Sequence, residues 1–439
     1  MPSLLLMTAT FAPSRVIGGR RAERIAVHLS RAGWQVTVLT LHPQYMAPFD
    51  PDFRVEGDFE VLTTHALMPR VHARTLLQSL RKGGSATPPG TGSSQVPAAQ
   101  GPVGQFRKVL ATKARKLRPG IEKSLSLLEF PDMWMGWGPF ARRAVRGRKF
   151  DVVLGTMPPF STAPIARRIA RDVGAKLVLD YRDPWCEILS LSTPNPKVAG
   201  LDQHRRHREL EDACLAAADL VIGVTPTICE WLRQRCRCEV ALVTNAFASP
   251  ERPPAPPDAA RRPQRLVYAG SLAYGRDLTP ILLAMAQLRP AFGPGDLRLE
   301  HAGPHGQVLR EQAVALGVDD AVDDLGEVSS ARALQMLDGA LAGVVLVPPV
   351  VEYGYPGKIF EILGRGRPLL LVARQGSDSA RLVDRHQLGW THDAADVDGL
   401  AATLRRALAG EAPVPQDLDQ LQADTVMADM QRRLAALVG

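Results

Sequence analysis

Residues 3–40 read SLLLMTATFAPSRVIGGRRAERIAVHLSRAGWQVTVLT, and their pattern fixes the architecture of the first half of the chain. The apolar run Ser3–Thr8 predicts a buried strand, and apolar residues recur at the spacing of one helix face within Arg21–Arg31. Gly33 ends that helix, and Trp34–Thr40 alternates as a second strand. A strand, a loop, a helix and another strand form the repeating unit of a parallel α/β sheet.

The same alternation continues to about residue 244 and starts again after a proline-rich stretch. Residues 249–264 begin with Ser249–Pro257, whose proline density neither a helix nor a central strand tolerates. We therefore expect a linker there, between an N-terminal domain over 1–248 and a C-terminal domain over 265–415. Both halves alternate strands and helices, which predicts two Rossmann-like domains that face each other.

Composition excludes several classes of protein. The 439 residues are 45% hydrophobic and 22% charged, which is incompatible with a disordered or fibrous chain. No apolar run approaches the ~18–20 residues of a membrane helix, and the first residues resemble a strand rather than a signal peptide. Five cysteines form no disulfide framework, so a cytoplasmic protein is expected.

The net charge of +8 is concentrated in one segment. Residues 70–123 contain eleven Lys or Arg and one acid, Glu122. Within them, 83–104 has the composition of a flexible loop, and the weakly amphipathic 105–125 is either a solvated helix face or a surface for an anionic membrane. Aromatic residues do not interleave with the basic ones, so no nucleic acid partner is expected.

Ligands of parallel α/β sheets bind beyond the carboxyl ends of the strands, so the loops there carry the candidate residues. The first loop brings Arg15, Gly18 and Gly19 to the start of a helix, where backbone N–H groups and the helix dipole favour an anion. An ordinary turn is the alternative. The pattern is not Gly-x-Gly-x-x-Gly, so no dinucleotide site is indicated.

A second loop, Asp180–Trp185, places two carboxylates around an arginine. Asp180, Arg182 and Asp183 are either an Asp–Arg pair that fixes the loop or groups that hold a polar substrate in a cleft. No metal site is predicted, because Cys236 and Cys238 have no second pair at zinc spacing. His204 and His207 likewise lack a third ligand.

Two loops of the second half suit a phosphorylated ligand. In Tyr268–Arg276, a backbone N–H at Gly270, the hydroxyl of Ser271 and the guanidinium of Arg276 could all bind phosphate. In the other loop, Tyr353–Glu361, Glu361 lies about one turn into a helix. Helical side chains lean toward the N-terminus of their helix. Its carboxylate either accepts hydrogen bonds from ribose hydroxyls or only complements the helix dipole.

Taken together, five stretches resemble the family-four retaining glycosyltransferases of the GT-B fold, of the bacterial polysaccharide and natural-product type. The stretches follow in order over nearly the whole chain, and they are the Gly18-Gly19 loop, Pro131–Trp137, Pro158–Ser161, Asp180–Trp185 and Pro356–Glu361. The resemblance implies a cleft between two Rossmann-like domains, of which the C-terminal binds a nucleotide sugar and the N-terminal an acceptor. It also implies that residues 416–439 form a helix that crosses back to the N-terminal domain.

The resemblance also implies roles for individual residues. Glu361 would bind the ribose, and Asp183, Arg276 and Lys358 form the expected catalytic set. The expected donor site consists of Gly18, Gly19, Gly270, Ser271, Arg276, Gly303, Gly354, Pro356, Lys358 and Glu361. The expected acceptor region consists of Arg15, Arg182 and Asp183. The donor would be a UDP-, GDP- or dTDP-linked sugar, with no cofactor and no metal.

Two departures from the family pattern stand out. Tyr353 occupies the position of a second family glutamate that contacts the donor sugar, and the nearest acid is Glu352. Asn245–Ala248 replaces the usual Asn-Gly-x-Asp. The acceptor remains open among a glycan, a lipid-linked sugar and a small molecule. A non-catalytic sugar-nucleotide-binding partner and a nucleotide-sugar 2-epimerase remain the alternative functions.

Overall fold

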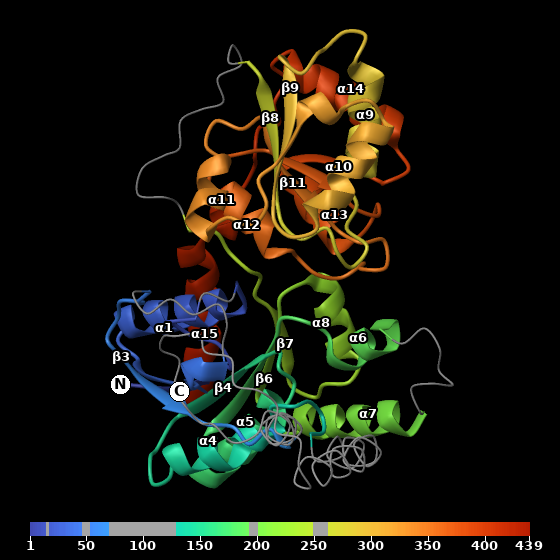
Figure 1. Cartoon of the computed structure of the whole chain (residues 1–439). Helices are drawn as coiled ribbons and strands as arrows, with labels where there is room; N and C mark the ends of the chain where they lie inside the picture. Colours follow the sequence, from blue (N-terminus) through green and yellow to red (C-terminus); the bar gives the residue numbers. More distant parts are fainter. Residues whose placement is uncertain (15–16, 46–52, 70–128, 193–200, 249–261) are drawn as a thin grey trace, which may run out of the picture.

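The computed structural model describes the chain except residues 15–16, 46–52, 70–128, 193–200 and 249–261. Two parallel sheets with flanking helices lie one above the other (Figure 1). The expected pair of facing Rossmann-like domains is therefore confirmed. Arg15, the segments 83–104 and 105–125, and most of the linker lie outside the described residues.

The N-terminal sheet has the strand order β3-β2-β1-β4-β5-β6-β7, in which β1 is an interior strand between β2 and β4. Its strands are β1 (Ser3–Met7), β2 (Gln35–Leu41), β3 (Phe59–Thr64), β4 (Val152–Met157), β5 (Lys176–Tyr181), β6 (Leu220–Gly223) and β7 (Glu239–Leu242). Its helices are α1 (Arg20–Arg31), α4 (Gly138–Ala144), α5 (Thr162–Val173), α6 (Trp185–Ser192), α7 (Leu201–Leu215) and α8 (Pro226–Arg233).

The C-terminal sheet has the order β10-β9-β8-β11-β12-β13 and repeats this arrangement. Its strands are β8 (Gln264–Ala269), β9 (Leu297–Ala302), β10 (Val322–Asp324), β11 (Ala342–Leu346), β12 (Leu369–Val372) and β13 (Gly389–His392). Its helices are α9 (Thr279–Leu288), α10 (Gly306–Ala315), α11 (Ser330–Met336), α12 (Gly357–Leu363), α13 (Asp378–Arg385) and α14 (Val397–Leu408).

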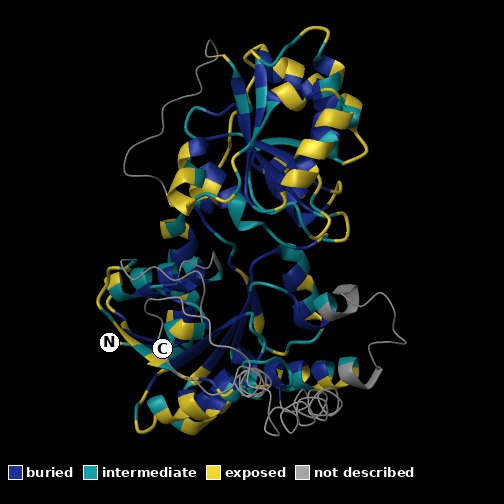
Figure 2. Cartoon of the chain, in the orientation of Figure 1, coloured by how far each residue is buried: buried dark blue, intermediate teal, exposed yellow. Residues whose placement is uncertain are grey.

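The interior strand β1 separates two hydrophobic cores. Leu5 and Met7 face one core, and Leu4 and Leu6 face the other, because successive side chains of a strand point to opposite faces. Figure 2 shows the sheets buried and the outer faces of their helices exposed. This burial on both faces explains why β1 is a continuous apolar run rather than an alternating one.

The chain crosses between the domains at two adjacent points. After β7, the Phe247 amide donates to the Leu421 carbonyl, and the Ala423 amide donates to the Phe247 carbonyl. A 3-10 turn, Leu418–Leu421, and helix α15 (Ala423–Val438) follow there, and α15 packs on α1. The expected crossover helix is therefore present, and both chain ends lie on the N-terminal domain (Figure 1).

Sequence periodicity missed two strands at the sheet edges. β3 and β13 each pair with one neighbour only, and β3 is half exposed, with polar residues such as Glu60 and Thr63. An edge strand buries less apolar surface, so its apolar pattern is weaker. Among the described helices, none is both long and apolar enough to cross a membrane.

Candidate active site

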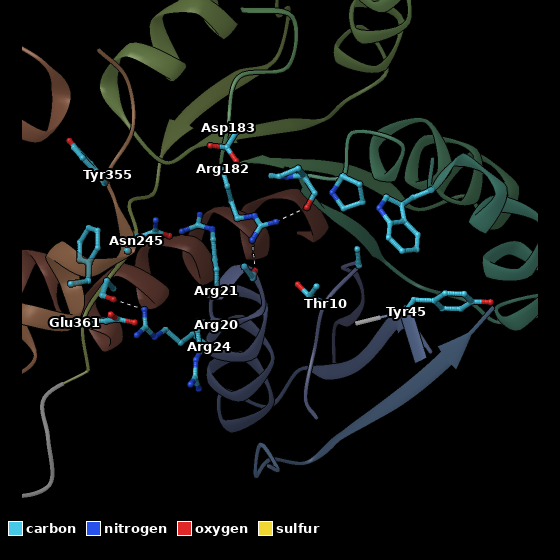
Figure 3. Close-up of a pocket in the computed structure, with 18 residues that line it drawn as sticks. Thr10, Arg20, Arg21, Arg24, Tyr45, Arg182, Asp183, Asn245, Tyr355 and Glu361 are labelled. Carbon is cyan, nitrogen blue, oxygen red and sulfur yellow. Dashed lines mark hydrogen bonds between the residues drawn. The ribbon is translucent and has the colours of Figure 1, made fainter. Parts of the chain in front are cut away.

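Two adjoining cavities lie where the domains meet. The larger, about 560 Å³, is lined by both domains and is called the interdomain cavity. The smaller, about 230 Å³, is formed mostly by the C-terminal domain and is called the C-domain pocket. Arg20 and Glu361 line both. Figure 3 shows the interdomain cavity with Glu361 toward one end and Tyr45 toward the other.

The C-domain pocket gathers four of the predicted donor residues, Gly270, Gly303, Lys358 and Glu361. Gly303 has a φ of 154°, and a Cβ there would lie 2.3 Å from the Gly270 carbonyl oxygen. Only glycine therefore allows the loops after β8 and β9 to approach so closely. The remaining walls include the apolar side chains of Val328, Leu334 and Leu337 and the polar residues Glu327 and Ser330. A charged rim completes the pocket.

Lys358 and Glu361 form that rim. The Lys358 ammonium donates to the Ala269 carbonyl. Burial lowers the pKa of Lys358, the nearby Glu361 opposes that shift, and Arg276 adds to it. The Glu361 side chain is exposed and makes no hydrogen bond or ion pair within the described part of the chain. Its carboxylate is therefore open to a ligand in either cavity.

A buried histidine, which the sequence analysis did not single out, supports the Gly270 loop. The His301 ring lies between Asp324 and the Gly270 carbonyl, with Nδ1 2.8 Å from Asp324 Oδ1 and Nε2 2.9 Å from the Gly270 oxygen. The Tyr268 ring stacks on it with 5.8 Å between centroids. These contacts fix the backbone that forms the floor of the C-domain pocket.

Other predicted donor residues line neither cavity. Ser271 Oγ lies 3.2 Å from His305 Nδ1 and accepts from the Ala273 amide. Arg276 donates to the Ala273 carbonyl, although its charge still acts on Lys358. The remaining members of this group are Gly19, Gly354 and Pro356. In the described structure, none of these five residues lines either cavity.

The N-terminal wall contains Gly18, Arg182 and Asp183. The Arg182 guanidinium donates to three carbonyls, those of Met157 at 2.9 Å, Pro158 at 2.6 Å and Gly18. Arg182 therefore holds two loops together. Burial raises the pKa of Asp183 and the Arg182 charge opposes that shift. The Asp183 carboxyl makes no hydrogen bond to the rest of the described chain, which leaves it available to a substrate.

Asp180 fixes the structure locally, which is one of the two roles that the sequence allowed. Its partner is Arg21 rather than Arg182. Nε and Nη2 of Arg21 donate to its carboxylate at 2.8–3.1 Å, and Arg21 also donates to the carbonyls of Val243 and Thr244. Arg21 is 5% exposed and Asp180 is fully buried. The pair ties α1 to β5 and to the end of the first domain, so Asp180 is not a ligand-binding group.

Sequence reasoning missed several groups that line the interdomain cavity, notably Arg24. Arg20 and Arg24 are four residues apart on α1 and therefore share one face, a signal that the sequence did contain. Arg24 donates to the Ala246 carbonyl. Burial lowers the pKa of Arg24, the neighbouring Arg20 adds to that effect, and Glu361 opposes it. Tyr45 and Tyr355 were also missed, whereas Trp134, Pro158, Pro159 and Asn245 lie in stretches that the sequence singled out without a role in the site.

Tyr353 packs away from both cavities. Its ring is 6% exposed and belongs to the core of the N-terminal domain, 5.4 Å from the Trp231 ring between centroids. Glu352 pairs with Arg374 at the surface. Neither residue therefore occupies the place of a donor-sugar ligand. Within the described ranges, no three His, Cys, Asp or Glu side chains cluster as metal ligands would.

Comparison with known proteins gives a family and a fold. The model of the "Glycosyl transferase 4-like domain" matches residues 18–246, slightly more than half of the chain. No curated protein sequence matches.

Solved structures resemble the whole chain at low sequence identity. Sucrose-phosphate synthase from Thermosynechococcus elongatus has a TM-score of 0.53 at 15% identity, covering 100% of this chain and 95% of the other. The apo lipopolysaccharide outer core galactosyltransferase WaaB has a TM-score of 0.58 at 11% identity, with 99% of both chains covered. HepE from Anabaena, solved with UDP and glucose, has a TM-score of 0.50 at 14% identity, covering 99% and 96%.

Proposed function

Because the chain belongs to the glycosyl transferase 4-like family and is a glycosyltransferase of the GT-B fold, we propose that it transfers a sugar from a nucleotide diphosphate sugar with retention of configuration. One observation carries the proposal. The Glu361 carboxylate, without a partner in the described chain, lines both the C-domain pocket and the interdomain cavity. A nucleotide in the pocket and an acceptor in the cavity would meet beside it.

In the orientation we propose, the donor places its nucleotide in the C-domain pocket. Glu361 accepts two hydrogen bonds from the ribose hydroxyls, as a carboxylate can. The base lies toward the apolar wall of Val328, Leu334 and Leu337. The diphosphate then lies near Lys358, whose charge is only partly balanced by Glu361. UDP, GDP and dTDP all satisfy this chemistry.

Catalysis relies on stabilising the charge of the leaving diphosphate. The sugar–phosphate bond breaks toward an oxocarbenium-like sugar, and the developing negative charge faces Lys358 and the α1 arginines Arg20 and Arg24. One well-placed donor of this kind contributes about 3 kcal/mol to catalysis. These cations supply the charge that a metal ion would otherwise supply, so we propose a metal-independent reaction.

Retention follows if the acceptor attacks from the face that the diphosphate leaves. The acceptor hydroxyl forms the new bond to the anomeric carbon while a phosphate oxygen takes its proton, so no separate base is needed. The Asp183 carboxyl lines the acceptor side of the cavity and orients that hydroxyl by a hydrogen bond. Closure of the two domains excludes water and limits hydrolysis of the donor.

For the acceptor, we propose a precursor of a cell-surface polysaccharide or a lipid-linked glycan at the inner membrane face. The concentration of Lys and Arg in residues 70–123 supports this proposal. Sedimentation with anionic liposomes at low and high salt tests it. Binding that salt weakens is expected, whereas no binding at low salt would remove the membrane from the proposal.

A thermal-shift screen against UDP, GDP, dTDP, ADP and CMP tests the donor site. At a ligand concentration of 100 times Kd, the correct nucleotide stabilises the protein by about 2.7 kcal/mol. No shift with any nucleotide would contradict a nucleotide-sugar site in the C-domain pocket. Donor consumption with and without acceptor then separates transfer from 2-epimerisation, because an epimerase needs no acceptor.

A further inference from the structure

The N-terminal end of the interdomain cavity is aromatic. Tyr45 and Trp134 both line it, and Figure 3 shows Tyr45 at the end opposite Glu361. The two rings meet edge to face, with 6.1 Å between centroids and 82° between planes. Pro158 and Pro159 extend this apolar surface. An aromatic surface in an otherwise arginine-rich cavity indicates a ligand with an apolar face.

Hydrogen bonds hold both aromatic residues in place. The Tyr45 hydroxyl donates to the Ala66 carbonyl at 3.3 Å. The Trp134 amide donates to Asp132 Oδ1 at 2.9 Å, and the Trp134 carbonyl accepts from the Trp137 amide at 2.9 Å. Asp132 Oδ2 in turn accepts from the Ser161 amide at 2.8 Å, at the start of α5. These bonds fix the Tyr45 hydroxyl and the backbone of Trp134, and the edge-to-face contact between the two rings orients the indole.

The two neighbouring tryptophans differ in one decisive way. Trp137 is fully buried, and its indole N–H donates to Thr64 Oγ1 at 2.7 Å. Trp134 is half-buried in the cavity wall, and its indole N–H meets no acceptor among the described residues. Buried indole N–H groups usually find a partner. That of Trp134 is open to a ligand oxygen, and so are the nearby Thr10 and Asp183.

We propose that this end of the cavity binds a glycosyl ring of the acceptor, stacked on Trp134. This inference rests on the proposed transferase function and adds the residue that holds the acceptor sugar. A pyranose has one face of C–H groups, which the negative π-face of an indole attracts, and a rim of hydroxyls. The rim meets the Trp134 N–H and the Asp183 carboxyl, and one hydroxyl points toward the donor side.

Other acceptor classes fit this wall less well. A phosphate group here would meet the Asp183 carboxylate, while the Arg182 guanidinium beside it already donates to three carbonyls. A lipid chain would leave Thr10, Asp183 and the Trp134 N–H without partners, and unmade hydrogen bonds are costly. A flat aromatic acceptor would stack equally well but would not use the polar rim. A sugar ring satisfies both the aromatic face and the polar rim.

Saturation-transfer NMR with methyl glycosides tests the proposal. Methyl α- and β-glycosides of glucose, galactose, mannose and N-acetylglucosamine are added with and without UDP. We expect transfer to the ring protons of at least one glycoside, at least tenfold weaker binding to Trp134→Ala, and intermediate binding to Trp134→Phe, which keeps a ring but lacks the N–H. Trp390→Phe, at a half-buried tryptophan on β13, is the matched control and should bind as the wild type does.

Three results would overturn the proposal. They are equal binding by Trp134→Ala, no transfer to any glycoside in the wild type, and preference for an aromatic probe such as a flavonoid over every glycoside. If Trp134→Ala fails to fold, Trp134→Phe and the wild type still decide. Failure of the transferase proposal is distinguishable, because it shows as absent nucleotide binding by the wild type, whereas Trp134 variants should keep wild-type nucleotide affinity.

Discussion

At the scale of single residues, the site depends on charged side chains that make no hydrogen bond or ion pair within the described part of the protein. Asp180 and Asp183 illustrate the difference. The Asp180 carboxylate is fully buried and takes three donor contacts from Arg21, whereas Asp183 makes no hydrogen bond within the described chain. Both are aspartates near the carboxyl end of β5, with Asp180 inside the strand and Asp183 just after it. Which of them is available to a ligand depends on where α1 lies.

Glu361→Ala should weaken nucleotide binding by about 1.5–3 kcal/mol, the value of hydrogen bonds to a charged group. The carboxylate has no other described partner, so folding stability should change little. Isothermal titration calorimetry with the nucleotide selected by the screen measures the effect. Glu352→Ala is the control, because the Glu352 side chain forms a surface ion pair with Arg374 and lines neither cavity in the described structure. Wild-type affinity in folded Glu361→Ala protein would exclude Glu361 from the site.

Nucleotide affinity should fall in the alkaline range because of Lys358. Burial lowers the pKa of this ammonium, so it loses its proton below the ordinary lysine value of about 10.4. Only the protonated form attracts a diphosphate, so affinity stays constant near neutral pH and decreases as pH rises through the lowered pKa. Calorimetry between pH 7.5 and 10 measures this. Lys358→Met should bind more weakly and lose the dependence; a parallel decline in both proteins would contradict the assignment.

At the scale of secondary structure elements, α1 has two functions on two faces. One face buries Ala22, Ile25, Ala26 and Leu29 in the core, as the helix periodicity predicts. The other presents Arg20 and Arg24 to the cavity and Arg21 to Asp180. The apolar face can be recognised in the sequence, because a helix that buries one face repeats apolar residues at helical spacing. The arginine face becomes interpretable only once the second domain is placed opposite it.

Helix α7 should make the N-terminal domain sensitive to acid. The Trp185 indole on α6 donates to His207 Nδ1 at 3.0 Å, which requires that nitrogen to be unprotonated. Burial, with His204 and Arg206 nearby, lowers the pKa of His207 to about 4, whereas the unfolded value is about 6.5. Between these values the unfolded chain binds the proton more tightly. Stability should therefore decrease as pH falls from about 6.5 to 4, by at most about 1.4 kcal/mol per pH unit.

Urea unfolding at several pH values between 7 and 4 measures that dependence. His207→Gln keeps an acceptor for the Trp185 indole and removes the titration, so its stability should vary less with pH. Slopes that are the same in the variant and the wild type would assign the acid sensitivity to other groups.

At the scale of the whole molecule, the C-terminal helix belongs energetically to the N-terminal domain. Leu434 is fully buried on α15 and shares a core with Ile25 of α1. Leu434→Ala should destabilise the protein by about 2–5 kcal/mol, as other core leucine truncations do. The rate of amide hydrogen exchange should increase in α1 and stay unchanged in α9.

The matched substitution lies in the other core. Leu404 is 2% exposed on α14, which packs on α9. Leu404→Ala should quicken exchange in α9 and not in α1. The same exchange pattern in both variants would show that the domains unfold as one unit and would contradict the separate cores.

Local chemistry was sufficient to predict the two Rossmann-like domains, because strand runs, helix periodicity and a proline-rich boundary are local signals. That Gly270, Gly303, Lys358 and Glu361 come together was predictable, because each follows a strand or opens a helix, and all four line the C-domain pocket. The partner of Asp180, the inward turn of Tyr353 and the open N–H of Trp134 were not predictable. Each depends on contacts between segments distant in the chain, and residue type does not encode which neighbour is already satisfied.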